Sequence, residues 1–406
     1  MDAQRAIESV FRIEQAKLIA GLARITRDIG VAEELAQDAM VTALEQWPQT
    51  GIPDKPGAWL MQAAKHRAID HVRRDRMKER KHEEIQPPPN PDADTIVDEL
   101  DDEFGDDLLR LIFTACHPVL NREARVALTL RMVGGLTSDE IARAFLVPIQ
   151  TMQQRIVRAK KQLTDSKVPY EVPAGDELPP RLESVLEVIY LIFNEGYAAT
   201  SGDDWTRPEL CEDALRLGRI LAVRAPQLAE AHGLVALMEI QASRFAARTG
   251  PNGEIVRLLD QNRLRWNQLL IRRGLDALAK AEKLGGGVYT LQAAIAACHA
   301  RAKHAADTDW KRIAALYGDL ARIAPSPIVE LNRAVAVSMA DGPAAALAIV
   351  DTLEDALGEY YLLPSVRGDL LEKLGRLDEA RAEFTRAAAL TNNAAERELL
   401  TARARG

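Results

Sequence analysis

The sequence predicts an all-α protein. Its dominant residue types, Ala, Leu, Glu and Arg, are favourable in helices, and only 5% of the 406 residues are aromatic. Apolar residues recur at helical spacing along most of the chain, whereas runs of alternating β-branched residues are nearly absent. The length allows two or three domains. We expect two small helical domains, the second with a helix-turn-helix, followed by a longer helical remainder.

The first domain is expected over residues 1–80. Helical periodicity runs through 5–27, 31–47 and 56–80, and the chain between these segments carries Gly30 and the stretch PQTGIPDKP. Residues 81–105 follow. Their Pro cluster and like charges disfavour packing, so we expect a flexible, extended linker.

The second domain is expected over residues 106–164. A Pro-rich hinge, residues 165–180, leads from it to the helical remainder, residues 181–406. In that remainder, Ala346 and Ala380 lie 34 positions apart. This is the tetratricopeptide period, with small residues where two helices must touch, and it predicts a tetratricopeptide-like solenoid.

Composition predicts a cytoplasmic protein. Cys116, Cys211 and Cys298 have no paired spacing, which argues against a zinc site or a disulfide framework and is typical of a reducing compartment. The N-terminus lacks the apolar core of a signal peptide, and no uncharged apolar run reaches membrane-spanning length. We therefore expect no membrane contact, no metal and no cofactor.

Charge is segregated along the chain, although the formal net charge is −8. Lys and Arg residues concentrate in 65–82, and 155–161 holds four cations and no acid. Phosphate affinity depends on the local field within a Debye length, about 10 Å at 0.1 M salt, and not on the sum over the chain. The net acidity therefore does not exclude nucleic-acid binding.

Residues 136–163, LTSDEIARAFLVPIQTMQQRIVRAKKQL, predict two helices joined by a tight turn. Thr137 can accept a hydrogen bond from the backbone of Glu140, whose carboxylate can reach back, so this capping box starts the first helix. Pro148 suits the first turn of the second helix, because the N–H that it lacks would have no partner there. Residues at helical spacing in the second helix are expected to pack inward: Ile149, Met152, Ile156, Ala159 and Leu163.

The outer face of this second helix is polar and basic. Amides and guanidiniums on it can read base edges in a major groove, and Lys160 and Lys161 can meet phosphate. The predicted DNA-binding residues are Gln150, Thr151, Gln153, Gln154, Arg155, Arg158 and Lys161. The alternative is an ordinary helical hairpin with a solvated basic face.

A second basic helix is predicted from Trp59 to about Arg80. Its core stripe is Leu60, Ala64, Ala68 and Val72, and its opposite, cationic face carries Gln62, Lys65, His66, Arg73 and Arg76. An aromatic residue and a flexible loop beside such a helix suit the holding of an unstacked base. The alternative is that Trp59 is a core residue and the cations are a solvated face.

The helix over 31–47 is predicted to be acidic on one side. Leu35, Ala39, Ala43 and Trp47 are expected to face inward, whereas Glu33, Glu34, Gln37 and Asp38 form an acidic-polar patch. Such a patch is usually a solvated face. Here it can instead dock a basic partner helix.

Taken together, these features resemble the sigma factors of bacterial RNA polymerase, and most closely the extracytoplasmic-function group. The resemblance covers residues 1–164 and rests on AEELAQDA (32–39), PGAWLMQAAKHRAIDHVRR (56–74) and LTSDEIARAFLVPIQTMQQRIVRAKK (136–161). It implies that Glu33, Glu34, Gln37 and Asp38 contact core RNA polymerase. It also implies that Trp59, Lys65, His66, Asp70, Arg73 and Arg74 lie at the minus-ten element of promoter DNA, and that the helix-turn-helix residues above read the minus-thirty-five element.

This sequence departs from the family pattern at several positions. His66 stands where many relatives carry Asn, and Asp38 stands where Glu is usual. Gln150 and Gln153 replace a common Gly and Lys at the start of the recognition helix. The resemblance implies that binding survives these changes, but it does not define the preferred promoter sequence.

The remainder, residues 181–406, is similar to the C-terminal extension of one sigma subgroup, with LIFNEGYAATSGDDW (191–205) and APSPIVELNRAVAV (324–337) among its motifs. The resemblance implies a tetratricopeptide-like domain that regulates the factor. Its groove is expected to bind a peptide, a protein or a small ligand.

Two other functions compete with the sigma-factor reading. The first is a DNA-binding regulator with a tetratricopeptide sensor that never joins polymerase. The second is an enzyme in the C-terminal half, for which acid–base candidates are Glu195, Asp203, Asp204, His232, Asp260 and Arg263. No glycine-rich phosphate loop or metal-ligand spacing accompanies these residues, so we expect no enzymatic activity.

Overall fold

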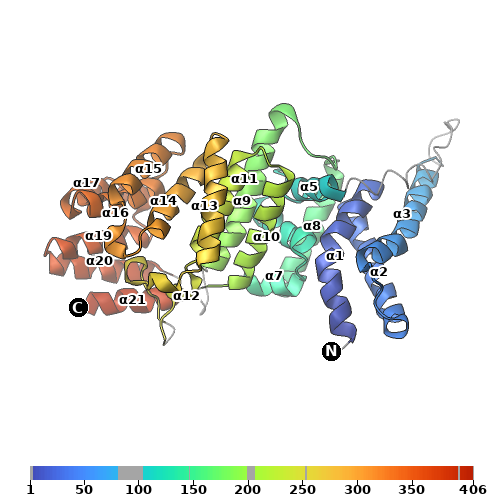
Figure 1. The fold of residues 1–406 in the computed structure, drawn as a ribbon, viewed down its shortest axis with the longest axis horizontal. Coiled ribbons are helices and arrows are strands. Elements are labelled where there is room, and N and C mark those ends of the chain that lie inside the picture. The colour runs from blue at the N-terminus through green and yellow to red at the C-terminus, as the bar shows by residue number, and fades with distance from the viewer. Residues whose placement is uncertain are drawn as a thin grey trace. The chain divides into compact units, whose positions relative to one another are not determined.

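The computed structural model describes residues 3–80, 104–145, 147–198, 206–251, 254–391 and 394–405 (Figure 1). Regular structure in these ranges is helical, apart from one isolated antiparallel bridge between Thr249 and Ile255, and the predicted all-α class is confirmed. The chain divides into two compact units, Met1–Leu191 and Ile192–Gly406. The expected linker falls almost wholly outside the described residues.

The N-terminal unit begins with three long helices, α1 (Ala3–Thr26), α2 (Ile29–Thr50) and α3 (Pro56–Arg80). Helix α1 packs on both of the others, and its Leu18, Ile19 and Leu22 are almost fully buried. Asp28 caps α2, because its Oδ1 accepts hydrogen bonds from the N–H groups of Gly30 and Val31 at 2.7 and 3.0 Å. The sequence predicts a break at Gly30, whereas α2 begins at Ile29 and Gly30 is its second residue.

A second group of helices completes this unit. It comprises α5 (Phe104–Ala115), α6 (Arg122–Thr129), a short π-helix (Leu130–Gly134), α7 (Ser138–Ala144), α8 (Ile149–Asp165), a 3₁₀ turn (Gly175–Glu177) and the first part of α9 (Leu178–Tyr197). Helix α5 packs against α1, so residues 3–80 and 104–191 belong to one compact unit. The two domains predicted from the sequence, residues 1–80 and 106–164, both lie within this unit.

The C-terminal unit contains the end of α9 and a succession of further helices. They are α10 (Pro208–Arg224), α11 (Ala229–Ala242), α12 (Phe245–Arg248), α13 (Gln268–Lys283), α14 (Val288–Arg301), α15 (Trp310–Ile323), α16 (Pro327–Ala340), α17 (Pro343–Asp351), α18 (Glu354–Leu357), α19 (Leu362–Lys373), α20 (Leu377–Leu390) and α21 (Ala394–Arg405). Three 3₁₀ turns lie at Leu258–Asp260, Arg263–Arg265 and Ala305–Asp307.

Helix α11 is the centre of the first half of this unit. It packs against α10, α13 and α14, and every residue from 231 to 240 is buried. The approach to α13 is close: a Cβ on Gly274 would lie 2.6 Å from Ile240 Cγ1. A larger residue at that position would push the two helices apart.

The residues behind the predicted repeat lie in two helix pairs, α16 with α17 and α19 with α20. Ala346 and Ala380 are both buried in one core that also contains Phe384 and Leu331. Small residues therefore do sit where these helices touch. None of the described helices has the length and hydropathy needed to cross a membrane.

Candidate nucleic-acid and polymerase interfaces

The helix-turn-helix is built from α7 and α8. Thr137 Oγ1 accepts the N–H of Glu140 at 3.1 Å, and the Glu140 carboxylate accepts the N–H of Thr137 at 2.7 Å. The predicted capping box is therefore confirmed. Pro148 is the residue immediately before α8, where its fixed φ and missing N–H cost the helix nothing.

The inner face of α8 holds it against the rest of the unit. Met152, Ile156, Ala159 and Leu163 are buried, as predicted. Ile149 was expected to pack inward with them, but its side chain is 42% exposed. It is the first residue of α8 and precedes the turn that carries Met152, so the helices beneath do not cover it.

The outer face of α8 is available to a partner. Arg155 is partly exposed, and the other predicted DNA-binding residues of this helix are exposed: Gln150, Thr151, Gln153, Gln154, Arg158 and Lys161. They project from a helix whose other side is fixed, which is the arrangement that major-groove reading requires. Contact with DNA by these residues remains a prediction.

Helix α3 presents a second polar surface. Leu60, Ala64 and Ala68 are buried, while Val72 is only partly covered. Of the residues predicted to meet the minus-ten element, His66, Asp70, Arg73 and Arg74 are exposed and Lys65 is partly exposed. The side chain of Arg76 lies outside the described residues.

Trp59 has a structural contact in addition to its predicted role. Its ring meets that of Trp47 edge-on, with centroids 5.2 Å apart and an interplanar angle of 64°. The pair links α3 to α2, and Trp59 remains partly exposed. This contact supports the alternative in which Trp59 stabilises the domain, and stacking on a base remains a prediction.

The acidic patch on α2 is only partly exposed. Glu34, Gln37 and Asp38 face solvent, and Asp38 lies 3.5 Å from Arg67 of α3. Glu33 was expected on the same open face, but it is 2% exposed, so that expectation is wrong. The reason is tertiary: part of the second helical group covers this side of α2.

Two cations enclose the Glu33 carboxylate. Arg131 Nε donates to Glu33 Oε1 at 2.6 Å, and Lys160 of α8 pairs with Oε2. Gln37 Nε2 also donates to Oε1, at 3.1 Å. Lys160 was expected to meet phosphate, and in this structure it faces Glu33 instead, because α8 lies against α2.

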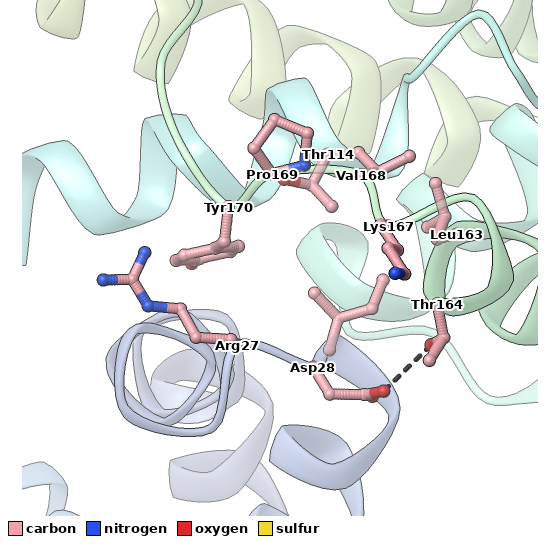
Figure 2. Close-up of a pocket in the computed structure, with 10 residues that line it drawn as sticks. Arg27, Asp28, Thr114, Leu163, Thr164, Lys167, Val168, Pro169 and Tyr170 are labelled. Carbon is pink, nitrogen blue, oxygen red and sulfur yellow. Dashed lines mark hydrogen bonds between the residues drawn. The ribbon is translucent and has the colours of Figure 1, made fainter.

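Further contacts join the same two groups of helices (Figure 2). Thr164 Oγ1 donates to Asp28 Oδ2 at 2.9 Å, as the dashed line in Figure 2 shows. The buried Tyr170 hydroxyl lies 3.0 Å from the carbonyl oxygen of Ala20 and 2.9 Å from that of Asp107. Its single proton is therefore shared between two acceptors. Burial and the nearby Asp107 raise the pKa of Tyr170 above its usual value, which keeps this donor protonated.

A cavity of about 370 Å³ lies beside these contacts. It is bounded by Arg27–Ile29 between α1 and α2, by Leu163 and Thr164 of α8, and by the hinge segment Lys167–Tyr170 (Figure 2). Arg27 and Lys167 have φ values of 57° and 49°. Each follows the end of a helix, where a left-handed residue closes the last turn.

Sequence reasoning missed Arg131, Thr164 and Tyr170. Their partners lie 98, 136 and up to 150 positions away in the chain. Helical periodicity marks which residues share a face of one helix, but it carries no signal about a distant helix. Nothing in the sequence pattern could therefore have revealed these pairs.

The acid–base candidates of the C-terminal unit do not form one site among the residues that the structure describes. Glu195 pairs with Arg207, His232 Nε2 lies 3.0 Å from the carbonyl of Pro226, and Asp260 pairs with Arg257. Arg263 is buried, where it donates to backbone carbonyls of His299 and Ala302. Asp203 and Asp204 fall outside the described residues.

Cys116 and Cys211 are buried and poorly suited to nucleophilic chemistry. Burial raises the pKa of Cys116 to about 12 and that of Cys211 to about 12, so both remain thiols at neutral pH. Across the described ranges, no cluster of three or more His, Cys, Asp or Glu side chains has the geometry of a metal site.

Comparison with known families accounts for most of the N-terminal unit. Residues 10–77 match sigma-70 region 2, and residues 110–163 match sigma-70 region 4. Residues 181–282 match a family of unknown function. No solved structure matches the chain.

Relatives are found both along the whole chain and in its N-terminal part. An uncharacterized protein of Rhizobium meliloti is 43% identical over 93% of this chain and 90% of its own length. The probable ECF RNA polymerase sigma factor SigI of Mycobacterium tuberculosis is 27% identical over 45% of this chain and 67% of its own length. The ECF RNA polymerase sigma factor SigC of Mycobacterium tuberculosis is 26% identical over 39% of this chain and 82% of its own length.

The chain therefore belongs to the sigma-70 family. Within it, the chain is a member of the extracytoplasmic-function group that carries a C-terminal helical extension. Region 2 of this chain is residues 10–77, and region 4 is residues 110–163.

Proposed function

We propose that this protein binds core RNA polymerase and directs it to promoters, where transcription starts. The observation that carries the proposal is the presence of regions 2 and 4 in one chain, with an exposed polar-basic face on α8. A sigma factor needs no covalent chemistry of its own, since the polymerase supplies the active site. Sigma-70 family membership does not favour a regulator that works without polymerase.

Region 4 is proposed to anchor the complex upstream. The amides of Gln150, Gln153 and Gln154 suit adenine edges, and the guanidiniums of Arg155 and Arg158 suit guanine edges or phosphates. Lys161 suits a phosphate group, and such a contact adds affinity for DNA without sequence preference. These residues together are proposed to read the minus-thirty-five element.

Region 2 is proposed to open the minus-ten element and to bind polymerase. The exposed side chains His66, Asp70, Arg73 and Arg74 lie along one helix, where they can contact DNA. On α2, Glu34, Gln37 and Asp38 offer an acidic surface to a basic partner helix, and Glu33 would join them once uncovered.

We propose that the C-terminal unit is a tetratricopeptide-like regulatory domain. A cavity of about 430 Å³ lies between α10, α11 and α13, and its lining includes Arg219, Arg273 and Lys280. Such a cavity suits a peptide, a protein segment or a small ligand. A protein that works with RNA polymerase acts in the cytoplasm, and the composition also predicts this location.

The experiment that tests the DNA-binding assignment is footprinting of promoter DNA with reconstituted holoenzyme. Arg155→Ala is expected to weaken promoter binding by about 1–3 kcal/mol, because base or phosphate contacts are lost. The matched control is Arg143→Ala, which removes an exposed arginine from α7 that pairs with Asp139. Unchanged occupancy with Arg155→Ala would remove α8 from the DNA interface.

A further inference from the structure

Glu33 and Glu34 are neighbours on α2 with opposite environments. Glu34 is exposed, whereas Glu33 is 2% exposed and lies between Arg131 and Lys160. A buried carboxylate is stable only when cations or donors replace the water that it has lost. Both cations come from region 4. The acidic surface of region 2 is thus partly occupied by a basic surface of the same chain.

Contacts made by residues that flank region 4 in the chain hold it in this place. Thr164 of α8, which directly follows region 4, donates to Asp28, the residue that caps α2. The hydroxyl of Tyr170 bridges carbonyls of α1 and α5, and Arg24 of α1 lies 3.5 Å from the buried Asp107 of α5. The occupied surface is therefore part of an extended interface and not an isolated ion pair.

We infer that region 4 is an internal competitor for the polymerase-binding face of α2. In this closed state, Arg131 and Lys160 occupy the place proposed for a basic helix of the polymerase and exclude such a helix from Glu33. This inference rests on the proposed function, because it assigns a regulation to the same α2 surface. The two regions share one chain, so the internal partner is present at a high effective concentration.

In the closed state, region 4 covers Glu33 on α2, while the DNA-binding face predicted on α8 stays exposed. The outer face of α8, including Gln150 and Arg158, stays exposed while Lys160 on the same helix is engaged. The closed state therefore blocks docking on polymerase rather than base reading. A partner that binds only the open state has an apparent affinity reduced by the open fraction. A chain that is about one-tenth open would bind polymerase tenfold more weakly than an open variant.

The first test measures closure without polymerase. The full-length protein is treated with a carbodiimide and a small amine, and the modification rates of Glu33 and Glu34 are compared by mass spectrometry. We expect slow modification of Glu33 in the wild type and rates close to that of Glu34 in Arg131→Glu. The control Arg143→Glu reverses the charge of an exposed α7 arginine and should leave Glu33 protected. Equal rates for the two glutamates in the wild type would overturn the inference.

A second variant is needed because Arg131 also donates to the carbonyl of Leu136 within region 4. Replacing Arg131 therefore changes a contact inside region 4 as well as the contact with Glu33. Thr164→Glu places a carboxylate against Asp28 at an exposed position. Its control is Ser166→Glu, which adds the same charge just beyond the end of α8. Thr164→Glu should release Glu33 to modification, and Ser166→Glu should not.

The second measurement is the affinity of each full-length variant for core RNA polymerase. Arg131→Glu and Thr164→Glu are expected to bind about tenfold more tightly than the wild type. The two controls should match the wild type. If Glu33 becomes reactive while the affinity for polymerase stays unchanged, the internal competitor is refuted. If no variant binds polymerase at all, the proposed function fails, and the carbodiimide rates still decide whether the chain closes.

Discussion

Two glutamates, one in each unit, are almost completely buried between cations. Glu33 is 2% exposed and contacts Arg131 and Lys160, and Glu239 is 1% exposed and contacts Arg219 and Arg273. The partners of Glu239 belong to α10 and α13, helices that already pack on its own helix α11. The partners of Glu33 come from region 4, across the expected linker.

The difference shows that one arrangement of charge can serve two purposes. Around Glu239 the pairs join helices that share one core, so they contribute to the stability of a single unit. Around Glu33 the pairs join two sigma regions that must both reach a partner. The first cluster is expected to resist opening, and the second is expected to open when a competing surface arrives.

The largest expected effect tests this contrast directly. Glu239→Ala should lower the free energy of unfolding of the C-terminal unit by about 3 kcal/mol, the low end for a broken buried ion pair, because both arginines keep contact with solvent. Glu33→Ala should have a much smaller effect on unfolding, since its cations become hydrated once region 4 moves away. Urea unfolding followed by circular dichroism measures both. Equal losses of unfolding free energy in Glu239→Ala and Glu33→Ala would show that the two clusters do not differ in this way.

The second prediction concerns another buried group of the C-terminal unit. Burial, helped by Arg244 and Arg263, lowers the pKa of His299 to about 4 from 6.5. Between these values the unfolded chain binds more protons than the folded one, so stability is complete above pH 6.5 and falls as the pH drops toward 4. Moving from pH 7 to pH 5 should cost this unit about 2 kcal/mol.

The check is the same urea titration at both pH values, with His299→Gln as the comparison. The variant cannot titrate at this position, so its stability should depend less on pH over this range. A wild type and a variant with the same pH dependence would show that His299 is not buried in its neutral form.

The smallest effect on stability is expected at the capping box of α7. There the Glu140 carboxylate accepts hydrogen bonds from neutral donors of Thr137, whereas Glu33 and Glu239 pair with cations. Thr137→Ala removes the hydroxyl that accepts the N–H of Glu140, and it should destabilise the N-terminal unit by about 1 kcal/mol. Thr137→Ser keeps the hydroxyl and should restore most of the loss. Thermal unfolding of the two variants measures the difference. If both unfold at the wild-type temperature, the capping box does not stabilise α7.

Local features of the fold could be predicted from the sequence. The capping box depends on residues three positions apart, and the inner face of α8 depends on helical spacing, so Thr137, Glu140, Met152 and Ile156 were placed correctly. The error at Ile149 lies at a helix end, where periodicity still counts a residue that neighbouring helices no longer cover.

The environment of Glu33 could not be predicted in the same way. Glu33 lies at the border of the apolar stripe of α2, four positions after Ile29 and three before Ala36, where a charged side chain usually reaches solvent. Burial comes from Lys160 and Arg131, which are distant in sequence and join α2 only in the folded unit. The family resemblance supplied the functional assignment of the region, but it carried no information about this closed arrangement.

The most direct measurement of the central claim is run-off transcription with purified core RNA polymerase and the full-length protein on fragments of genomic DNA. We predict that the protein co-migrates with core polymerase and starts transcripts at discrete positions, and that core polymerase alone does not. Arg131→Glu should start at the same positions with greater yield. Core polymerase that initiates no better with any variant than without the protein would contradict the account.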